Sequence, residues 1–410
     1  MLNNILFIIS IFSLSIIGKK RGFFSTEIII ASIFFIYGYS FYLDNKLFDL
    51  ERISIESLGI LHINDLNYTY ILLFYTSFLL FYSLGTLTFY KYKPKLTTPV
   101  PFISNLKLYK LLLNLFTINF WFIISKIFNL QRLDKIAFLT DHNYLGFTAA
   151  LGLLATIFVW RKVITQKKVQ RYELFFLISA IIYGVLEGGR EIFIYSGIVV
   201  LPEFAKKKRK ILPIIGGMAI IFLLSIWKVL SVYLFSLGDI MLLMEFITNK
   251  YSFSFTYLDP AASLLLLNSY LDGAPIYDSL RFSYLFNTIG QVLNVFGLIE
   301  YESISKRVVE FYNPLVFRKG GGFAFSGILE SVLNFSYLGP AILGLILGVL
   351  LRINTLINGN TEKKILLNII FIILILKLVR TELAVVLKLY VLPFSILILL
   401  FKSKLKPIGR

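Results

Sequence analysis

The sequence predicts an all-α polytopic integral membrane protein. Of its 410 residues, 57% are hydrophobic and only 16% are charged, whereas soluble domains carry about 25% charged residues. The apolar residues gather in runs of roughly 15–22 residues, the length that a helix needs to cross a hydrocarbon core of about 30 Å. Because lipid offers the backbone no hydrogen bonds, each run is expected to be a helix. These observations exclude a soluble globular enzyme.

The chain contains about eleven such runs. The first has no basic segment before it and no small-residue cleavage site after it, so we interpret it as a span and not as a signal peptide. The predicted transmembrane helices are 2–17, 22–43, 69–89, 111–125, 144–160, 172–187, 191–205, 211–228, 338–351, 365–380 and 383–401.

Basic clusters set the predicted orientation. The net charge is +18, and in a polytopic protein such an excess is typical of Lys and Arg on the cytoplasmic side rather than of nucleic-acid binding. With eleven alternating spans, every basic cluster falls on one face, which places the N-terminus outside and the C-terminus inside. These clusters are Lys19–Arg21, Lys91–Lys110, Arg161–Arg171, Lys206–Lys210, Arg352–Lys364 and Lys402–Arg410.

One outward connection, 229–337, is long enough to form a helical periplasmic lid. It divides the chain into eight spans (1–228), the lid (229–337) and three spans with a cytoplasmic tail (338–410). Promoting two lid segments to spans would give thirteen, but would move Asp259, Asp272 and Asp278 to the cytoplasm, against the charge rule. The predicted lid helices are 231–248, 260–271, 278–296 and 302–312.

Charged residues inside or beside the membrane are functional candidates, because they cost free energy there. The tip Glu187-Gly188-Gly189-Arg190-Glu191 joins two spans. At 1.5 Å per residue, Arg190 lies only about 24–28 Å from the flanking cytoplasmic anchors, which recesses it to the depth of a lipid headgroup. Alternatively, Glu187 and Arg190 neutralise each other at i,i+3 spacing.

Two further charged sets face the same side. Around the last two spans stand Lys377, Arg380, Glu382 and Lys388; Arg380 with Glu382 is alternatively a plain interfacial pair, whereas Lys388 is expected to face the bundle interior. In the lid, glycines allow backbone N–H groups to converge on an anion before a helix that contains Glu330, although a flexible hinge explains them equally well. The lid set is Arg281, Arg318, Lys319, Gly320, Gly321 and Gly322.

These groups suit a metal-free site for an anionic lipid headgroup. The chain has no cysteine and two distant histidines, and it contains neither an Asp-x-Asp motif nor a P-loop. Fixed cations stabilise charge that develops on a leaving diphosphate. A sugar hydroxyl that attacks such a donor needs one carboxylate base, and Glu330 is the best-placed candidate.

The run Gly320–Gly339, with its glycine turn, Ser326, Glu330 and Asn334-Phe335 before a glycine-spaced span, resembles the bacterial oligosaccharide repeat unit polymerases, the Wzy-type O-antigen polymerases. The Gly-Gly-Arg tip at 188–190 is similar to a further element of that family. The resemblance implies an inner-membrane glycosyltransferase of the multi-spanning lipid-dependent type. It acts at the periplasmic face, uses undecaprenyl-diphosphate-linked oligosaccharides as donor and acceptor, needs no metal or other cofactor, and works with a chain-length-regulating co-polymerase.

Two alternatives stay open. The O-antigen ligases have a similar topology, but that family uses a histidine in its large outer loop and residues 229–337 contain none. A lipid-linked oligosaccharide flippase would also be lined by cations, but two related halves and short loops are expected of it.

Overall fold

The structure is a computed structural model of the 410-residue chain. It describes residues 1–21, 25–49, 63–88, 106–128, 130, 132–166, 168–187, 254–258, 260–281, 298–318, 325–357 and 362–402, and single positions within 192–199, 240–248 and 287–294.

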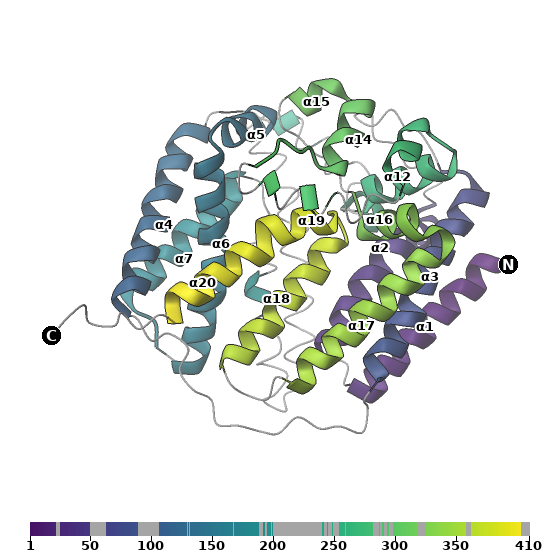
Figure 1. The fold of residues 1–410 in the computed structure, drawn as a ribbon, viewed down its shortest axis with the longest axis horizontal. Coiled ribbons are helices and arrows are strands. Elements are labelled where there is room, and N and C mark those ends of the chain that lie inside the picture. Colours follow the sequence, from purple (N-terminus) through teal and green to yellow (C-terminus); the bar gives the residue numbers. More distant parts are fainter. Residues whose placement is uncertain are drawn as a thin grey trace. The chain divides into compact units, whose positions relative to one another are not determined.

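Throughout these described residues the regular secondary structure is helical (Figure 1). The first half contains α1 (Leu2–Arg21), α2 (Thr26–Phe48), α3 (Asp65–Leu87), α4 (Leu106–Ile127), α5 (Arg132–Asp141), α6 (Asn143–Gln166) and α7 (Arg171–Glu187). The second half contains α11 (Phe255–Leu258), α12 (Ala261–Leu271), the 3-10 helix η2 (Pro275–Leu280), α14 (Ile304–Tyr312), α15 (Pro314–Arg318), α16 (Gly327–Phe335), η3 (Ser336–Leu338), α17 (Gly339–Ile357), α18 (Glu362–Leu378), α19 (Leu383–Val386), the π-helical turn η4 (Leu387–Val391) and α20 (Leu392–Lys402).

The chain is a helical polytopic membrane protein. Among the described residues, seven helical segments are long and apolar enough to cross a membrane: Leu2–Arg21, Thr26–Phe48, Asp65–Leu87, Leu106–Ile127, Tyr144–Ile164, Gly327–Asn354 and Leu383–Phe401. Two more predicted spans correspond to helices of 17 residues each, α7 and α18. Residues 211–228 and most of 191–205 lie outside the described residues. The total of eleven therefore stays a prediction.

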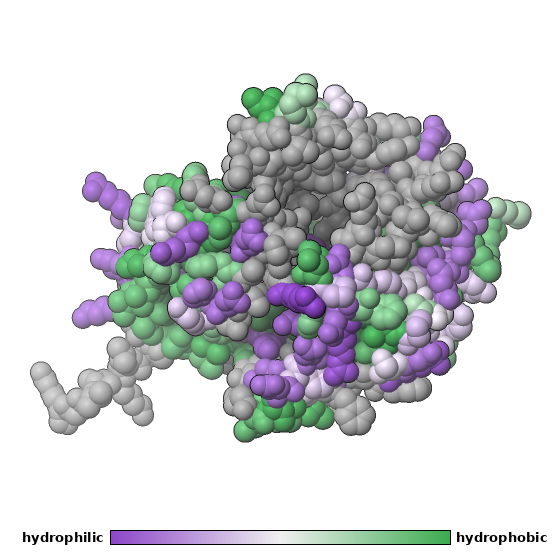
Figure 2. Space-filling model, turned by 90° about the horizontal axis from the view of Figure 1, so that it is seen from above, coloured by the Kyte–Doolittle hydropathy of each residue, from purple (hydrophilic) through white to green (hydrophobic). Residues whose placement is uncertain are grey.

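Apolar side chains remain exposed on the spanning helices. Ile8 is 64% exposed, Ile118 66% and Leu399 69%. Figure 2 shows such apolar residues (green) over much of the described surface, with hydrophilic residues (purple) between them. A soluble monomer rarely leaves large apolar patches in water, whereas lipid tails solvate them at no cost. This surface therefore agrees with a membrane environment.

The chain divides into two compact units, each of which combines segments that are far apart in the sequence. Unit 1 comprises Met1–Lys95, Asn249–Gly359 and Phe371–Lys388, and unit 2 comprises Leu96–Thr248, Asn360–Ile370 and Leu389–Arg410.

Unit 1 is organised around a parallel pair of helices, α3 and α17. A Cβ atom at Gly344 would overlap the carbonyl oxygen of Phe78, and one at Gly348 would lie 2.5 Å from that of Tyr82. The contacts advance in the same direction along both helices, so the helices run parallel. Glycines four residues apart allow this close approach, as in other small-residue helix pairs of membrane proteins.

The two ends of unit 1 differ in chemistry. At one end, the Arg21 guanidinium donates to the carbonyl oxygen of Thr86, and Nε of Arg352 donates to that of Thr88 at 3.3 Å. These arginines belong to two of the basic clusters that the sequence assigns to the cytoplasm. Their position at one common end agrees with the predicted alternation of α1, α2, α3 and α17. The side of the membrane on which this end lies stays a prediction.

The opposite end of unit 1 carries helices of the segment 229–337, which is predicted as a lid. Asp44 near the end of α2 accepts hydrogen bonds from the backbone N–H groups of Phe255 (2.9 Å) and Thr256 (2.6 Å) in α11. Asn67 in α3 donates to Asn268 of α12 at 3.0 Å. The lid helices predicted at 260–271 and 302–312 are confirmed as α12 and α14. Those predicted at 231–248 and 278–296 fall mostly outside the described residues.

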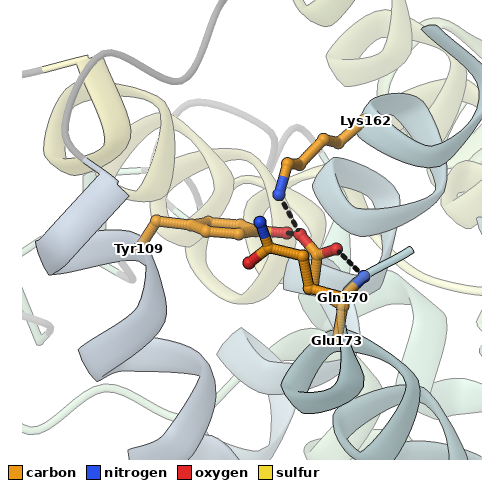
Figure 3. Close-up of polar contacts among 4 residues, drawn as sticks. All are labelled: Tyr109, Lys162, Gln170 and Glu173. Atoms are coloured by element: carbon orange, nitrogen blue, oxygen red, sulfur yellow. Dashed lines mark hydrogen bonds and ion pairs between the residues drawn. The ribbon is translucent and has the colours of Figure 1, made fainter. Parts of the chain in front are cut away.

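In unit 2, a buried ion pair connects neighbouring helices (Figure 3). Nζ of Lys162 in α6 pairs with Oε1 of Glu173 in α7, and the Tyr109 hydroxyl of α4 donates to the same oxygen at 3.0 Å. The backbone N–H of Gln170 donates to Oε2 of Glu173 at 2.9 Å. Glu173 and Tyr109 are fully buried and Lys162 is 7% exposed. Three helices are therefore joined at one carboxylate.

Candidate functional site

Helix α16 carries the first candidate residue and is bounded sharply at both ends. Its N-cap is Ser326, whose hydroxyl accepts from the backbone N–H of Leu329 at 3.2 Å, as expected for a serine before a helix. It ends at Ser336, which has a positive φ of 53°. A Cβ atom at Gly339 would overlap the carbonyl oxygen of Ser331, so only glycine fits where α17 begins. Helices α16 and α17 thus meet at a tight corner.

This corner changes the environment that the sequence suggests for Glu330. Residues 229–337 are predicted as lid, but the apolar helical stretch starts at Gly327 and runs to Asn354. The physical reason is that α16 is apolar and packs on α17 through the corner. Glu330 therefore lies within the apolar stretch instead of in a helix of the predicted lid.

The Glu330 carboxylate is fully buried and only half satisfied. Its Oε2 accepts from the backbone N–H of Leu383 at 2.8 Å, which caps the start of helix α19. Within the described part of the chain, its Oε1 has no hydrogen-bond partner. Buried polar atoms are normally paired, and an exception calls for an explanation. Asn334 does not supply the missing bond, because its side chain donates to the Glu330 backbone carbonyl at 2.8 Å.

A second buried carboxylate, that of Glu382, lies one residue before Leu383. Its Oε2 accepts from the side chain of Asn287 (3.0 Å) and from the backbone N–H of Ile304 (3.1 Å). Its Oε1 accepts from the Ser305 hydroxyl at 3.0 Å. The carboxylate therefore caps the N-terminus of lid helix α14. Burial raises the pKa of Glu382, and the hydrogen bonds from Ser305 and Asn287 oppose that rise.

The alternative in which Arg380 and Glu382 form a plain interfacial pair does not describe the partners of Glu382. Arg380 is exposed in the turn between α18 and α19, whereas the partners of the buried Glu382 carboxylate are Asn287, Ile304 and Ser305. A helix N-terminus presents unsatisfied N–H groups and a positive dipole end, so it is a suitable partner for a buried carboxylate.

Asn287 joins the two carboxylates. Its Nδ2 donates to Glu382, and its side chain also lies beside the Glu330 carboxylate. Its own Oδ1 is buried and, among the residues that the structure describes, has no partner. Among the described residues, the cluster therefore holds two acceptor oxygens without a donor, Oε1 of Glu330 and Oδ1 of Asn287, and either a proton on the Glu330 carboxyl or an additional donor would satisfy them.

Of the predicted cationic site residues, the structure describes Arg281, Arg318, Arg380 and Lys388. Arg281 pairs with Asp278 at 3.0 Å on the surface, and Arg318 is exposed at the end of α15. Lys388 lies in the π-helical turn η4, close enough to Lys306 of α14 for the two charges to interact. Single π-helical turns occur frequently at functional sites.

The remaining predicted site residues include several that cannot be placed. Arg190, Glu191, Lys319, Gly320, Gly321 and Gly322 lie outside the described residues. Glu187 is half-buried at the end of α7 in unit 2. Next to it, Nζ of the buried Lys135 donates to the carbonyl oxygen of Leu186 at 3.0 Å. Burial lowers the pKa of Lys135, and the Glu187 charge opposes this.

Sequence reasoning did not assign Glu382 or Asn287 to the site. Glu382 offered a signal, since an acidic residue directly before an apolar run is typical of a helix start. Asn287 offered none, because its role depends on contacts with residues far away in the chain. Within the described residues, His, Cys, Asp and Glu side chains form no group of three or more that would suit a metal ion.

The fold and the site define a helical polytopic membrane protein with a buried, incompletely satisfied carboxylate cluster at the lid end of unit 1. No protein-family profile, curated protein or solved structure matches the chain.

Proposed function

We infer that this protein is a surface-polysaccharide polymerase of the O-antigen type. In this proposal it transfers an undecaprenyl-diphosphate-linked glycan onto a second lipid-linked oligosaccharide at the periplasmic face of a bacterial inner membrane. The observation that carries the proposal is the fully buried Glu330 carboxylate, whose Oε1 lacks a hydrogen-bond partner in the described residues. The family resemblance of residues 320–339 supplies the substrate class.

Glu330 is the proposed general base. Its Oε2 accepts from Leu383, so in this proposal a sugar hydroxyl that reaches the buried carboxylate bonds to Oε1, which has no partner in the described residues. As the hydroxyl oxygen attacks the anomeric carbon of the donor, its proton passes to Oε1 and the bond from that carbon to the diphosphate oxygen breaks. Undecaprenyl diphosphate leaves with the bonding electron pair. A base of this kind contributes typically 10²–10⁴-fold to the rate.

Cations are the proposed ligands of the diphosphate. The proposed residues are Arg190, Arg281, Arg318, Lys319 and Arg380, with Glu187, Glu191, Gly320, Gly321, Gly322, Asn334 and Lys388 in supporting roles. Fixed positive groups stabilise the charge that develops on the leaving group and supply what a divalent metal supplies elsewhere. The proximity of Lys306 to Lys388 supports an anion-binding role for this end of unit 1.

Surface-glycan electrophoresis of a deletion strain tests the proposal. The strain is complemented with wild type, Glu330→Gln, Arg190→Ala or Glu302→Gln, the last being a control because Glu302 is an exposed lid carboxylate. We expect Glu330→Gln and Arg190→Ala to lose the polymer ladder and to keep the single-repeat band, at normal protein abundance. The control keeps the ladder.

Other outcomes separate the alternatives. Loss of the single-repeat band together with the ladder points to a ligase or a flippase. An intact ladder in both Glu330→Gln and Arg190→Ala overturns the assignment of the site.

The proposed topology has its own test, because the chain contains no cysteine. Single cysteines at Lys46 and Arg281 are expected to react with a membrane-impermeant maleimide added outside spheroplasts, and one at Lys20 is not. The reverse pattern would invert the proposed orientation.

A further inference from the structure

Two carboxylates in unit 1 anchor lid helices to spanning helices by the same chemistry. Asp44 of α2 accepts from the first N–H groups of α11, and Glu382 accepts from those of α14. A carboxylate at a helix N-terminus is stabilised by charge-assisted hydrogen bonds and by the helix dipole. Asp44 can therefore serve as a control for Glu382 within the same molecule.

The two anchors differ in what lies next to them. Glu382 is followed by Leu383, whose N–H donates to Oε2 of Glu330 at 2.8 Å. Glu382 is also bound by Asn287, whose side chain lies beside the Glu330 carboxylate. Through Leu383 and through Asn287, Glu382 is therefore connected to the carboxylate of Glu330, the proposed general base. The bonds of Asp44 to α11 do not involve Glu330.

The connection has a definite geometric consequence. Glu382 is attached to α14 by Ile304 and Ser305, so its backbone, and with it the N–H of Leu383, is held in place by the lid helix. That N–H occupies one oxygen of Glu330, and the other oxygen is buried without a hydrogen-bond partner in the described residues. If α14 detached, the Glu330 carboxylate would lose this orientation.

We propose that Glu382 and Asn287 are positioning residues, which hold the Glu330 carboxylate with Oε1 available to a substrate hydroxyl only while lid helix α14 is docked on Glu382. The catalytic half of this inference rests on the proposed function, whereas the positional half does not. In this proposal, the docking of α14 on Glu382 and the orientation of the Glu330 carboxylate occur together. Such coupling would prevent proton abstraction before the lid has closed over both substrates.

Hydrogen exchange on the purified full-length protein in nanodiscs tests the positional half. The N–H of Leu383 in the first turn of a helix exchanges quickly unless a side chain accepts it. In Glu382→Gln, the new amide nitrogen accepts no hydrogen bond and the charge is lost, so we expect the Leu383 amide to exchange about tenfold faster. Asp44→Asn should accelerate exchange at Phe255 and Thr256 and leave Leu383 unchanged.

Surface-glycan electrophoresis of the same variants tests the catalytic half. We expect Glu382→Gln to lose most of the ladder, as Glu330→Gln does, and Asp44→Asn to retain it. A milder variant, Ser305→Ala, removes one hydroxyl donor to Glu382 and keeps the backbone N–H donors of residues Ile304 and Ser305. It should accelerate Leu383 exchange about threefold and shorten the ladder, so it decides the matter if Glu382→Gln fails to accumulate.

The outcomes are distinguishable. Unchanged Leu383 exchange in Glu382→Gln, or equal acceleration in Asp44→Asn, overturns the positioning role whatever happens to the glycan. Faster Leu383 exchange together with a normal ladder in both Glu330→Gln and Glu382→Gln supports the positioning role and overturns the proposed function.

Discussion

Two glutamates, Glu173 in unit 2 and Glu330 in unit 1, are both fully buried but differ in the number of hydrogen-bond partners of their carboxylates. Glu173 receives an ammonium group, a hydroxyl and a backbone N–H, so both of its oxygens are paired. Glu330 receives one backbone N–H, and its Oε1 has no partner in the described residues. A paired buried carboxylate is explained by the fold that it holds together. One left partly unsatisfied is costly, and a functional role accounts for that cost.

The largest expected effect tests the structural half of this comparison. Glu173→Gln leaves the ammonium of Lys162 buried without its counter-charge. Removing one member of a buried ion pair costs about 3–5 kcal/mol. We expect the variant to lower the free energy of unfolding by that amount, measured by denaturant titration of the purified protein in micelles. A loss under about 1 kcal/mol would show that water reaches Lys162.

A double variant tests whether the loss of stability in Glu173→Gln comes from the unpaired charge of Lys162. Lys162→Met with Glu173→Leu removes both charges and retains apolar volume, and such replacements are often neutral or stabilising. We expect the double variant to recover most of the loss seen in Glu173→Gln, because no unpaired charge remains. If the double variant is as unstable as the single one, the ion pair itself contributes net stability.

A smaller effect is expected at the hydroxyl that supports Glu173. Tyr109→Phe removes one hydrogen bond of 3.0 Å and leaves the ring contacts with Phe401 and Lys162 in place. A hydrogen bond to a charged group contributes about 1.5–3 kcal/mol, and the ion pair with Lys162 retains part of that stabilisation. We therefore expect a loss of about 1–2 kcal/mol in the same titration, smaller than for Glu173→Gln. An equal loss would mean that Tyr109 and Lys162 act as one unit.

The smallest stability effect is expected at Glu330. Glu330→Gln keeps an oxygen that accepts from Leu383 and removes a buried charge, so we expect the free energy of unfolding to change by less than about 1 kcal/mol, in either direction. Polymerisation should nevertheless be lost. A large destabilisation would place Glu330 in the same structural class as Glu173 and remove the reason for a catalytic role.

The comparison also explains what sequence reasoning could and could not find. Glu330 was identified from its local context, a glycine-rich turn and a helix start. Glu173 was not singled out, and its hydrogen bonds with Lys162 and Tyr109 were not anticipated. For Glu382 a plain interfacial pair with Arg380 was one of two alternatives, whereas its partners are Asn287 and the start of α14. In each missed case, the partner lies on another helix.

Apolar length and helix-start residues are local properties, and they suffice for the helical polytopic class and for most of the described helices. Nine of the eleven predicted runs coincide with described helices. The backbone in lipid has little choice other than a helix, so this part of the structure follows from the sequence by itself.

Only the tertiary structure decided which polar groups meet. The parallel approach of α3 and α17 places Gly344 and Gly348 of α17 directly against the backbone of α3. The bond from Leu383 to Glu330 joins residues 53 positions apart, and that from Asn287 to Glu382 spans 95 positions. Which donor reaches which buried carboxylate depends on how all the helices pack at once. A sequence pattern with a period of one helical turn carries no record of that packing.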